Sequence, residues 1–389
     1  MLNYYSTTCE VLLLLCLGAI VYVYVGYPLL LCIIALFHQR KRFQPGPEPL
    51  VSILIAAYNE ENSIAEKIQQ TLDLDYPEDK IEVLILSDCS TDRTDAIVRG
   101  FGDARVRLLR MPVRRGKTHA QNIGMKAAKG EIVVFSDATT VYHPQALRYL
   151  ICNYQDPTVG AVAGRNQYFD EKGTSPMGLG TVAFWNYETL IKTLQSRIST
   201  VSGCSGCIYS IRKNVYTDLA DDVISDLVQP LWVIQKGFRV VFENRAIAYE
   251  KTTYSVPEEF AMRVRVVTRA MRGLLSVPDL FNPMKYGWVT FQLISHKVLR
   301  WMVPFFLMGA LGLTAMLTFV EPARYFLWAQ TGFYGLAFFA RAFPVHRRWK
   351  LIGIPLYFCV LNTAALVSVF EVLRGRKYVV WETVRKTAA

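Results

Sequence analysis

One uncharged stretch, VLLLLCLGAIVYVYVGYPLLLCIIALF from Val11 to Phe37, limits most strongly how this chain can fold. As a helix that rises about 1.5 Å per residue, it is long enough to cross the hydrocarbon core of a bilayer. It lacks the basic start and the small-residue cleavage site of a signal peptide. The basic run HQRKRF follows directly, so the positive-inside rule predicts an external amino terminus and a cytosolic chain from residue 38 onward.

Three further apolar segments lie near the other end, at Met302–Val320, Tyr325–Phe343 and Leu351–Leu373. The segment before them, FNPMKYGWVTFQLISHKVLRW, mixes aromatic and basic residues, which is typical of an amphipathic helix on a membrane surface. With one span before the soluble part and three after it, the carboxyl terminus would lie outside. The basic tail RGRKYVVWETVRK opposes that count, so re-entry of one segment stays open as an alternative.

Composition agrees with a membrane protein that carries a large soluble part. The hydrophobic fraction is 52%, and the formal charge of +11 suits anionic lipid headgroups and anionic substrates. No nucleic-acid-binding motif accompanies the charge, so we expect no nucleic-acid partner. Of the eight cysteines, four lie in or beside the apolar segments, and the four of the soluble part are expected as free thiols in the cytosol. CSGC at 204–207 lacks the second ligand pair that zinc needs.

Between about Pro49 and Ser255 the chain alternates strands with helices. LVSILIAAY, IEVLILSD, VRLLRM and EIVVFSD read as buried strands, and amphipathic helical patterns separate them. Four such units predict an α/β domain with a mostly parallel sheet and helices on both faces. No G-x-G-x-x-G follows the first strand, which disfavours a Rossmann dinucleotide site.

Acidic side chains follow three of these strands. Glu60 comes after the first strand, Asp88 ends the second and Asp137 ends the fourth. Parallel strands deliver their carboxyl ends to one edge of a sheet, where α/β proteins bind ligands. A single strand-end aspartate is usually a helix cap, but three on one edge predict a site.

The segments VSILIAAYNEEN, LILSDCSTDRT, RRGKTHAQNIG, VVFSDATT and ISDLVQPL resemble, in order and spacing, the family 2 inverting glycosyltransferases. The membrane layout is similar to that of polysaccharide synthases and ceramide glucosyltransferases. The resemblance implies a GT-A type nucleotide-sugar-binding domain flanked by transmembrane helices. We divide the chain into four expected parts: an amino-terminal transmembrane helix (1–37), a cytosolic GT-A domain (38–255), amphipathic interfacial helices (256–300), and carboxyl-terminal transmembrane helices with a basic tail (301–389).

The resemblance also implies residues that bind the donor. Tyr58 and Glu60 would hold the base and ribose, Asp88 would accept a hydrogen bond from uracil, and Lys117 would face the nucleotide. Ser87 and Cys89 stand where the family's D-D-G-S turn has Asp and Gly. Gly206 matches the family's acceptor loop only loosely. Arg114 and Arg115 are interpreted as solvated surface charges outside the site.

Asp137 matches the first acid of the family's D-x-D motif, and Thr139 replaces the second. The implied Mg²⁺ or Mn²⁺ site, at Asp137 and Thr139, is therefore expected to be weak. Asp226 matches the general base of the T-E-D motif, which inverting transfer needs opposite the leaving nucleotide. The nearby Asp221 and Asp222 are interpreted as part of a solvated loop.

Polysaccharide synthases carry Q-x-x-R-W after this domain. Here Arg265 remains, to pair with the diphosphate, while Met262 and Val266 replace the Gln and the Trp. Arg263 and Arg269 are expected to face lipid on a basic amphipathic helix.

Together these features predict transfer from a nucleotide sugar, most simply a UDP-sugar, to a growing polysaccharide or a lipid-linked acceptor at the cytosolic face of a bacterial inner membrane. A ceramide- or polyprenyl-type lipid monoglycosyltransferase is one alternative. A non-catalytic membrane scaffold with this fold is another. A homo-oligomer or an export partner would suit polymer synthesis, since about four spans are few to line a channel.

Overall fold

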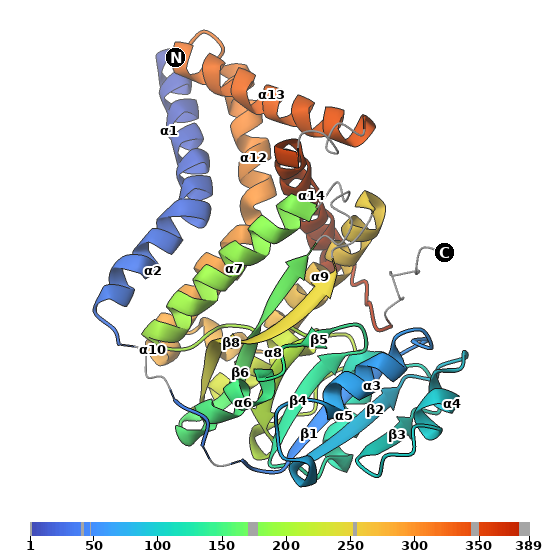
Figure 1. Ribbon diagram of the computed structural model, residues 1–389. Helices are drawn as coiled ribbons and strands as arrows, with labels where there is room; N and C mark the ends of the chain where they lie inside the picture. The colour runs from blue at the N-terminus through green and yellow to red at the C-terminus, as the bar shows by residue number, and fades with distance from the viewer. Residues whose placement is uncertain are drawn as a thin grey trace.

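The computed structural model describes residues 2–39, 43–46, 48–169, 178–251, 255–343 and 350–380. A sheet domain lies at one end and a group of long helices at the other (Figure 1). The domain has one eight-stranded sheet in the order β3-β2-β1-β4-β7-β6-β8-β5. Its strands are β1 Val51–Ala57, β2 Ile81–Ser87, β3 Val106–Arg110, β4 Ile132–Asp137, β5 Val141–Tyr142, β6 Val159–Phe169, β7 Ile208–Arg212 and β8 Arg239–Lys251.

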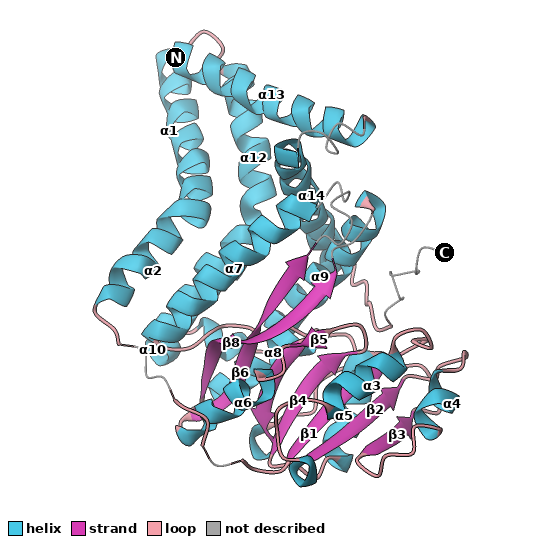
Figure 2. Ribbon diagram, viewed as in Figure 1, coloured by secondary structure: helices cyan, strands magenta, loops and turns pink. Residues whose placement is uncertain are grey.

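The first half of the sheet is parallel, which confirms the predicted α/β class. β1 pairs in parallel with both β2 and β4, and β2 with β3. All seven residues of β1 are buried, because helices cover both faces of the sheet (Figure 2). Ile53 and Ile55 pack in the core on one face, whereas Leu54 packs in the core on the other. The second half is mixed, since β7 runs antiparallel to β4 and β6.

Short helices complete the domain. They are α3 Ile64–Leu72, α4 Thr94–Arg99, α5 Lys117–Ala127, α6 Ala146–Ile151 and α8 Ser225–Gln235. α3 and α6 contribute to the core on one face of the sheet, and α5 and α8 to the core on the other. The register aligns Ala57 with Ser87 and Ala56 with Asp137. The residues that follow β1, β2 and β4 therefore leave the sheet at one edge.

Three helices in the described part of the chain are long and apolar enough to cross a membrane: Thr7–Leu36, Trp288–Met316 and Gly353–Leu373. The first comprises α1 Leu2–Val21, a π-helical turn at Tyr22–Gly26 and α2 Tyr27–Leu36. The second comprises α11 Trp288–Leu293, a π-helical turn at Ile294–Val298 and α12 Leu299–Met316. The third is α14 Gly353–Leu373. The helix that contains the predicted span at Met302 begins earlier, at Trp288, because the helix runs without a break through the expected interfacial segment.

The apolar segment at Tyr325–Phe343 bears on the alternative that one of the three later segments re-enters. It forms α13, Glu321–Ala342, but it is not among the candidate spans. Its apolar residues are interrupted by Gln330 and Thr331, and charges lie near both ends. In Figure 1, α13 crosses between the ends of α12 and α14 rather than running beside them.

The chain after α14 turns back to the sheet domain, so a count of one span before and three after does not describe this structure. A Schellman turn ends α14: Gly375 has φ +72°, and the Arg376 N–H donates to the Glu371 carbonyl at 3.0 Å. The tail then reaches the start of α5, where a Cβ added at Gly116 would lie 2.2 Å from the Val379 carbonyl oxygen. Because they touch, the tail and the sheet domain lie at the same end of the long helices.

Two more long helices connect the halves. α7 Gly178–Ile198 packs against α2 and α14, and α9 Val256–Leu275 packs along α14 and touches α8. The short α10, Pro283–Tyr286, precedes α11.

The first prediction concerns this topology. Single cysteines replacing Glu78 in the sheet domain and Val380 in the tail should both resist a membrane-impermeant maleimide in intact cells. A cysteine replacing Phe319, which is 70% exposed between α12 and α13, should react. Cells with only the native cysteines give the background. Opposite labelling of positions 78 and 380 would contradict the three-span arrangement.

Candidate active site

The turn after β1 presents Tyr58 and Glu60. Asn59 adopts a left-handed φ of 54°, and its side-chain oxygen accepts the Thr91 N–H at 2.8 Å. The Glu60 carboxylate accepts the Ser63 hydroxyl at 2.7 Å. The Arg114 guanidinium lies 3.6 Å from the centre of the Tyr58 ring, a cation–π contact. The interpretation of Arg114 as a solvated charge is therefore wrong.

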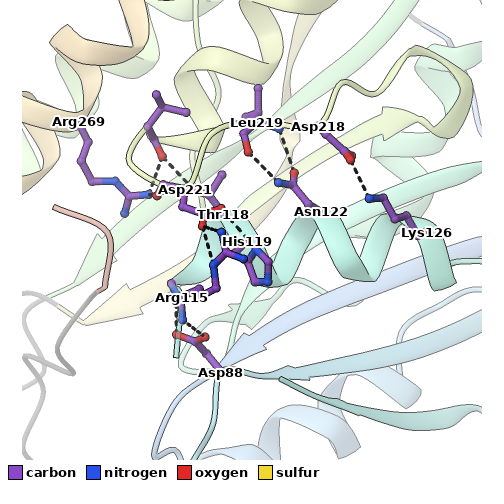
Figure 3. Close-up of polar contacts among 12 residues, drawn as sticks. Asp88, Arg115, Thr118, His119, Asn122, Lys126, Asp218, Leu219, Asp221 and Arg269 are labelled. Atoms are coloured by element: carbon purple, nitrogen blue, oxygen red, sulfur yellow. Dashed lines mark hydrogen bonds and ion pairs between the residues drawn. The ribbon is translucent and has the colours of Figure 1, made fainter. Parts of the chain in front are cut away.

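Asp88 is fully buried, and its carboxylate fixes the RRGK loop. Oδ1 accepts the Arg115 N–H and Oδ2 accepts the Gly116 N–H, both at 2.9 Å (Figure 3). Next to it, Cys89 has a φ of 62°. Cys89 stands where the D-D-G-S turn of the resembling family has glycine. The backbone therefore keeps the left-handed conformation here although the residue is not a glycine.

Gly116 allows the chain to enter α5 so that Lys117 points into the sheet edge. Gly116 has φ +91°, which side chains disfavour. The Lys117 ammonium forms an ion pair with Asp137 and donates to the Gly206 carbonyl at 3.2 Å. Three predicted site residues, Lys117, Asp137 and Gly206, therefore meet.

A second lysine acts on Asp137 from the other side. Lys67, on α3, is buried and donates to the Thr140 carbonyl at 2.8 Å. Burial lowers its pKa to about 7, although the Asp137 carboxylate opposes this change. Lys67 therefore links the core of the domain to the turn that carries Thr139.

The turn at Asp137 fits a hard divalent cation whose remaining ligands come from elsewhere. Asp137 offers carboxylate oxygens and Thr139 a hydroxyl, and both are oxygen ligands that Mg²⁺ accepts. Within the ranges that the structure describes, no three or more His, Cys, Asp or Glu side chains group around a possible metal position. At this turn Asp137 is the charged ligand, and the weakness expected of the site stays a prediction.

α5 also holds the loop that leads to Asp226 (Figure 3). The Asn122 side chain donates to the Leu219 carbonyl at 2.8 Å and accepts the Leu219 N–H at 3.1 Å. The Thr118 hydroxyl donates to the Val223 carbonyl at 3.0 Å, and Lys126 pairs with Asp218 at 2.9 Å.

The two aspartates of this loop are paired, contrary to the solvated-loop interpretation. Asp221 forms an ion pair with Arg115 at 2.7 Å, and Asp222 forms one with Arg272 at 2.8 Å. Arg115 lies at the surface, as expected, with its side chain 56% exposed, and its ion pair ties this loop to the loop that Asp88 holds.

Asp226, at the start of α8, reaches the same place as Lys117. A Cβ added at Gly206 would lie 3.0 Å from Asp226 Oδ2 and 3.5 Å from the Lys117 nitrogen, so Gly206 borders both groups. Burial raises the pKa of Asp226, while the cations Lys117 and Lys192 lower it. Asp226 Oδ1 is enclosed and has no hydrogen-bond partner among the residues that the structure describes.

The arginines of α9 point into the protein, so the expectation that Arg263 and Arg269 face lipid is wrong. Arg263 pairs with Glu259 at 2.7 Å and donates to the Tyr357 hydroxyl at 2.8 Å. Arg269 donates to the Thr118 hydroxyl at 2.9 Å and lies close enough to Asp226 to interact with its charge. Arg265 interacts electrostatically with Arg269. α9 therefore brings positive charge to the site. The amphipathic pattern of the helix, taken alone, predicts that these charges face the membrane.

Sequence reasoning missed Lys192, which lies on α7. Lys192 is buried and donates to the Ser205 hydroxyl at 3.0 Å, beside Gly206. One signal was available: Lys192 falls at helical spacing with other polar residues on one face of an otherwise apolar segment. CSGC contributes free thiols at Cys204 and Cys207, and burial raises the pKa of both.

Comparisons with known proteins agree with this geometry. Residues 52–219 match the family model Glycosyl transferase family 2. The chain is 28% identical over 221 residues to a poly-beta-1,6-N-acetyl-D-glucosamine synthase of Staphylococcus epidermidis strain RP62A, covering 55% of this chain and 53% of that protein. The synthase of the same name from Staphylococcus aureus strain MSSA476 is 27% identical over 241 residues, covering 60% and 57%. The chain thus matches just over half the length of these relatives.

A solved structure extends the likeness beyond the sheet domain. A mannosyltransferase from Pyrobaculum calidifontis, in complex with GDP-Man and Mn²⁺, superposes with a TM-score of 0.67 at 21% identity. The alignment covers 94% of this chain and 100% of that one. This likeness confirms the predicted GT-A fold.

The second prediction concerns Asp88. Asp88→Ala would leave the amide N–H groups of Arg115 and Gly116 without their acceptor, at about 1–3 kcal/mol for the buried one at Gly116. We expect a lower thermal unfolding midpoint and weaker nucleotide-sugar binding, measured on purified protein in lipid. Asp88→Asn keeps one acceptor oxygen, so its unfolding midpoint and its nucleotide-sugar binding should lie between those of the wild type and of Asp88→Ala. An Asp88→Ala protein with wild-type unfolding and binding would show that the loop is held in another way.

Proposed function

The chain contains a glycosyl transferase family 2 domain, and from this premise we propose that it is a membrane-integrated inverting glycosyltransferase. It transfers a sugar from a UDP-sugar to a saccharide acceptor at the cytosolic face of the membrane. The observation that carries this proposal is Asp226, an enclosed carboxylate with one unpartnered oxygen, beside the ion pair of Lys117 and Asp137. A scaffold without chemistry gives no reason to keep a carboxylate in that state.

The donor binds along the edge formed by the ends of β1, β2 and β4. Tyr58, backed by Arg114, offers a flat surface to the base, and Glu60 lies beside it for the ribose. Asp88 already accepts two backbone amides, so its main effect on the donor is to shape the RRGK loop. Lys117 is the cation of this loop that meets the diphosphate.

Asp226 takes the proton of the attacking hydroxyl. Burial raises its pKa, which makes the carboxylate a stronger base than an exposed one, whereas the neighbouring lysines favour its ionised form. As the hydroxyl oxygen bonds to the anomeric carbon, the bond from that carbon to the diphosphate breaks on the opposite face. The configuration at the carbon is inverted.

The departing diphosphate carries negative charge that the site must neutralise. Lys117 faces it, and Arg265 on α9 adds positive charge through its position beside Arg269. A bound Mg²⁺ or Mn²⁺ would be held by Asp137, Thr139 and phosphate oxygens, and would supply further positive charge.

The names of the relatives favour a polysaccharide product. A lipid acceptor of ceramide or polyprenyl type is the alternative, and product size distinguishes the two. Three candidate spans are few to enclose a polymer path, so export calls for a homo-oligomer or a partner protein. The basic residues that follow both Leu36 and Leu373 support a cytosolic domain by the positive-inside rule, and a bacterial inner membrane suits this orientation.

The direct test uses the full chain purified in lipid with a panel of labelled UDP-glucose, UDP-N-acetylglucosamine and GDP-mannose. We expect transfer from a UDP-sugar into a product of polymer size. Transfer from no donor in the panel would overturn the proposal. A product of lipid-linked monosaccharide size would replace it with the lipid alternative.

The third prediction concerns the base. Asp226→Asn keeps the size of the side chain but removes the proton acceptor, so transfer should fall about 10²–10⁴-fold while donor binding persists. Asp218→Asn, on the same loop but in an exposed ion pair, is the matched control and should retain activity. Substantial transfer by Asp226→Asn would mean that another group removes the proton.

The pH profile tests the same assignment. The wild-type kcat/KM should fall as the pH drops through the raised pKa of Asp226, because protonation removes the base. The Asp226→Asn protein should lose this acid limb from whatever activity remains.

The fourth prediction concerns Thr139. Thr139→Asp adds a second carboxylate at the turn, so the Mn²⁺ concentration for half-maximal activity should fall by about tenfold. Mn²⁺ binding in the presence of UDP, followed by electron paramagnetic resonance, should tighten in parallel. Thr139→Ser is the control, since it keeps the hydroxyl. Unchanged Mn²⁺ binding in Thr139→Asp would show that this turn does not face the ion.

A further inference from the structure

A second group of polar side chains lies beyond Asp226, on one face of α7. Thr181, Trp185, Glu188, Lys192 and Gln195 follow one another at spacings of three and four residues, so they share one side of the helix. All but Trp185 are buried. Buried polar groups normally have hydrogen-bond partners.

Lys192 connects this face to the base. Its ammonium lies 3.0 Å from the Ser205 hydroxyl, and Ser205 precedes Gly206, which lies beside Asp226. The same ammonium lies 5.8 Å from the centre of the Trp185 ring. Lys192 therefore lies between the Trp185 ring and the loop that borders Asp226.

Trp185 forms a partly exposed aromatic surface with an unmet hydrogen-bond donor. Its ring lies 5.2 Å from that of Tyr168, tilted by 30°. Its indole nitrogen, Nε1, is enclosed and has no acceptor in the part of the chain that the structure describes. An apolar ring beside a polar N–H suits a ligand that has both kinds of surface.

The neighbouring end of β6 also combines an aromatic ring with an enclosed polar atom that lacks a hydrogen-bond partner. Asn166 and Tyr168 are two residues apart, so they lie on one face of the strand. The Asn166 amide donates to Glu250 at 2.8 Å, while its oxygen is enclosed and accepts no hydrogen bond from any described residue. Glu250, Lys192, Lys117 and Asp137 all act on the thiol of Cys207, so this strand face borders the active site.

We propose that Trp185, Asn166 and Lys192 form the subsite for the acceptor sugar. The C–H face of a pyranose stacks on Trp185, while its hydroxyls bond the indole N–H, the Asn166 oxygen and the Lys192 ammonium. The hydroxyl that reacts then lies at Asp226. This subsite rests on the proposed transfer to a saccharide, and it supplies an aromatic surface in a chain where Val266 replaces the tryptophan of Q-x-x-R-W.

The occupant is a sugar rather than a lipid chain because of the unmet polar atoms. An acyl or prenyl chain would leave the indole N–H and the Asn166 oxygen enclosed without partners, which costs free energy. A β-linked sugar satisfies them and still covers the ring.

The test separates acceptor binding from chemistry. Full-length protein in lipid is assayed with β-linked pentasaccharides of glucose and of N-acetylglucosamine, the latter in 1,4 and 1,6 linkage. Trp185→Ala should raise the KM for the accepted primer tenfold or more, with a smaller change in kcat and unchanged donor binding. Trp185→Phe should stay within about threefold of the wild type, since it keeps the ring. Trp328→Ala, on the exposed side of α13, is the control.

Fluorescence provides a readout that does not depend on turnover. The pentasaccharides should change the emission of the wild type, and the change should disappear in Trp185→Phe although the other six of the seven tryptophans remain. A primer KM and an emission change that both survive in the Trp185 variants would overturn the subsite while leaving the proposed function standing. Transfer confined to lipid, unaffected by Trp185→Ala, would also overturn it. Absence of transfer from any donor by the wild type would overturn the proposed function itself.

Discussion

The two hydrogen bonds that Asp88 accepts from the RRGK loop determine the rest of the site. They fix the amides of Arg115 and Gly116, and thereby the point at which α5 begins. From there α5 sends Lys117 to Asp137, and Asn122 holds the loop that leads to Asp226. The donor side and the base side of the site therefore depend on one buried carboxylate. A change at Asp88 is expected to disturb both.

Local pattern was enough to predict the edge of the sheet but not what faces it. Asp88 and Asp137 end apolar runs whose length and composition mark buried strands, so their common edge follows from parallel pairing. Lys192 and Arg269 lie on helices distant in sequence, and only tertiary packing directs them to Asp226. α13 shows a related limit, because the apolar content of its segment resembles that of a span although Gln330 and Thr331 lie within it. Arg263 was misjudged because amphipathic periodicity does not distinguish a lipid surface from a protein interior.

The charges around Asp226 balance two opposing needs. Burial favours the protonated acid, whereas Lys117, Lys192 and Arg269 favour the ionised one. A base that is too strongly paired loses its affinity for the proton, and one that is too deeply buried never ionises. Gly206 borders both Asp226 and Lys117, and an added Cβ there would lie 3.0 Å from Asp226 Oδ2. A side chain at position 206 would therefore disturb this balance.

The return of the tail to Gly116 has a practical consequence for handling the protein. Residue 379 lies against Gly116 in the RRGK loop, so a purification tag or fluorescent fusion that replaces the residues after Val380 would start next to the site proposed for the donor. Such an addition would compete for space with the substrate and could be mistaken for a loss of intrinsic activity. Additions ahead of α1 emerge at the opposite end of the membrane helices (Figure 1). The amino end is therefore the safer attachment point for an affinity handle or a surface tether.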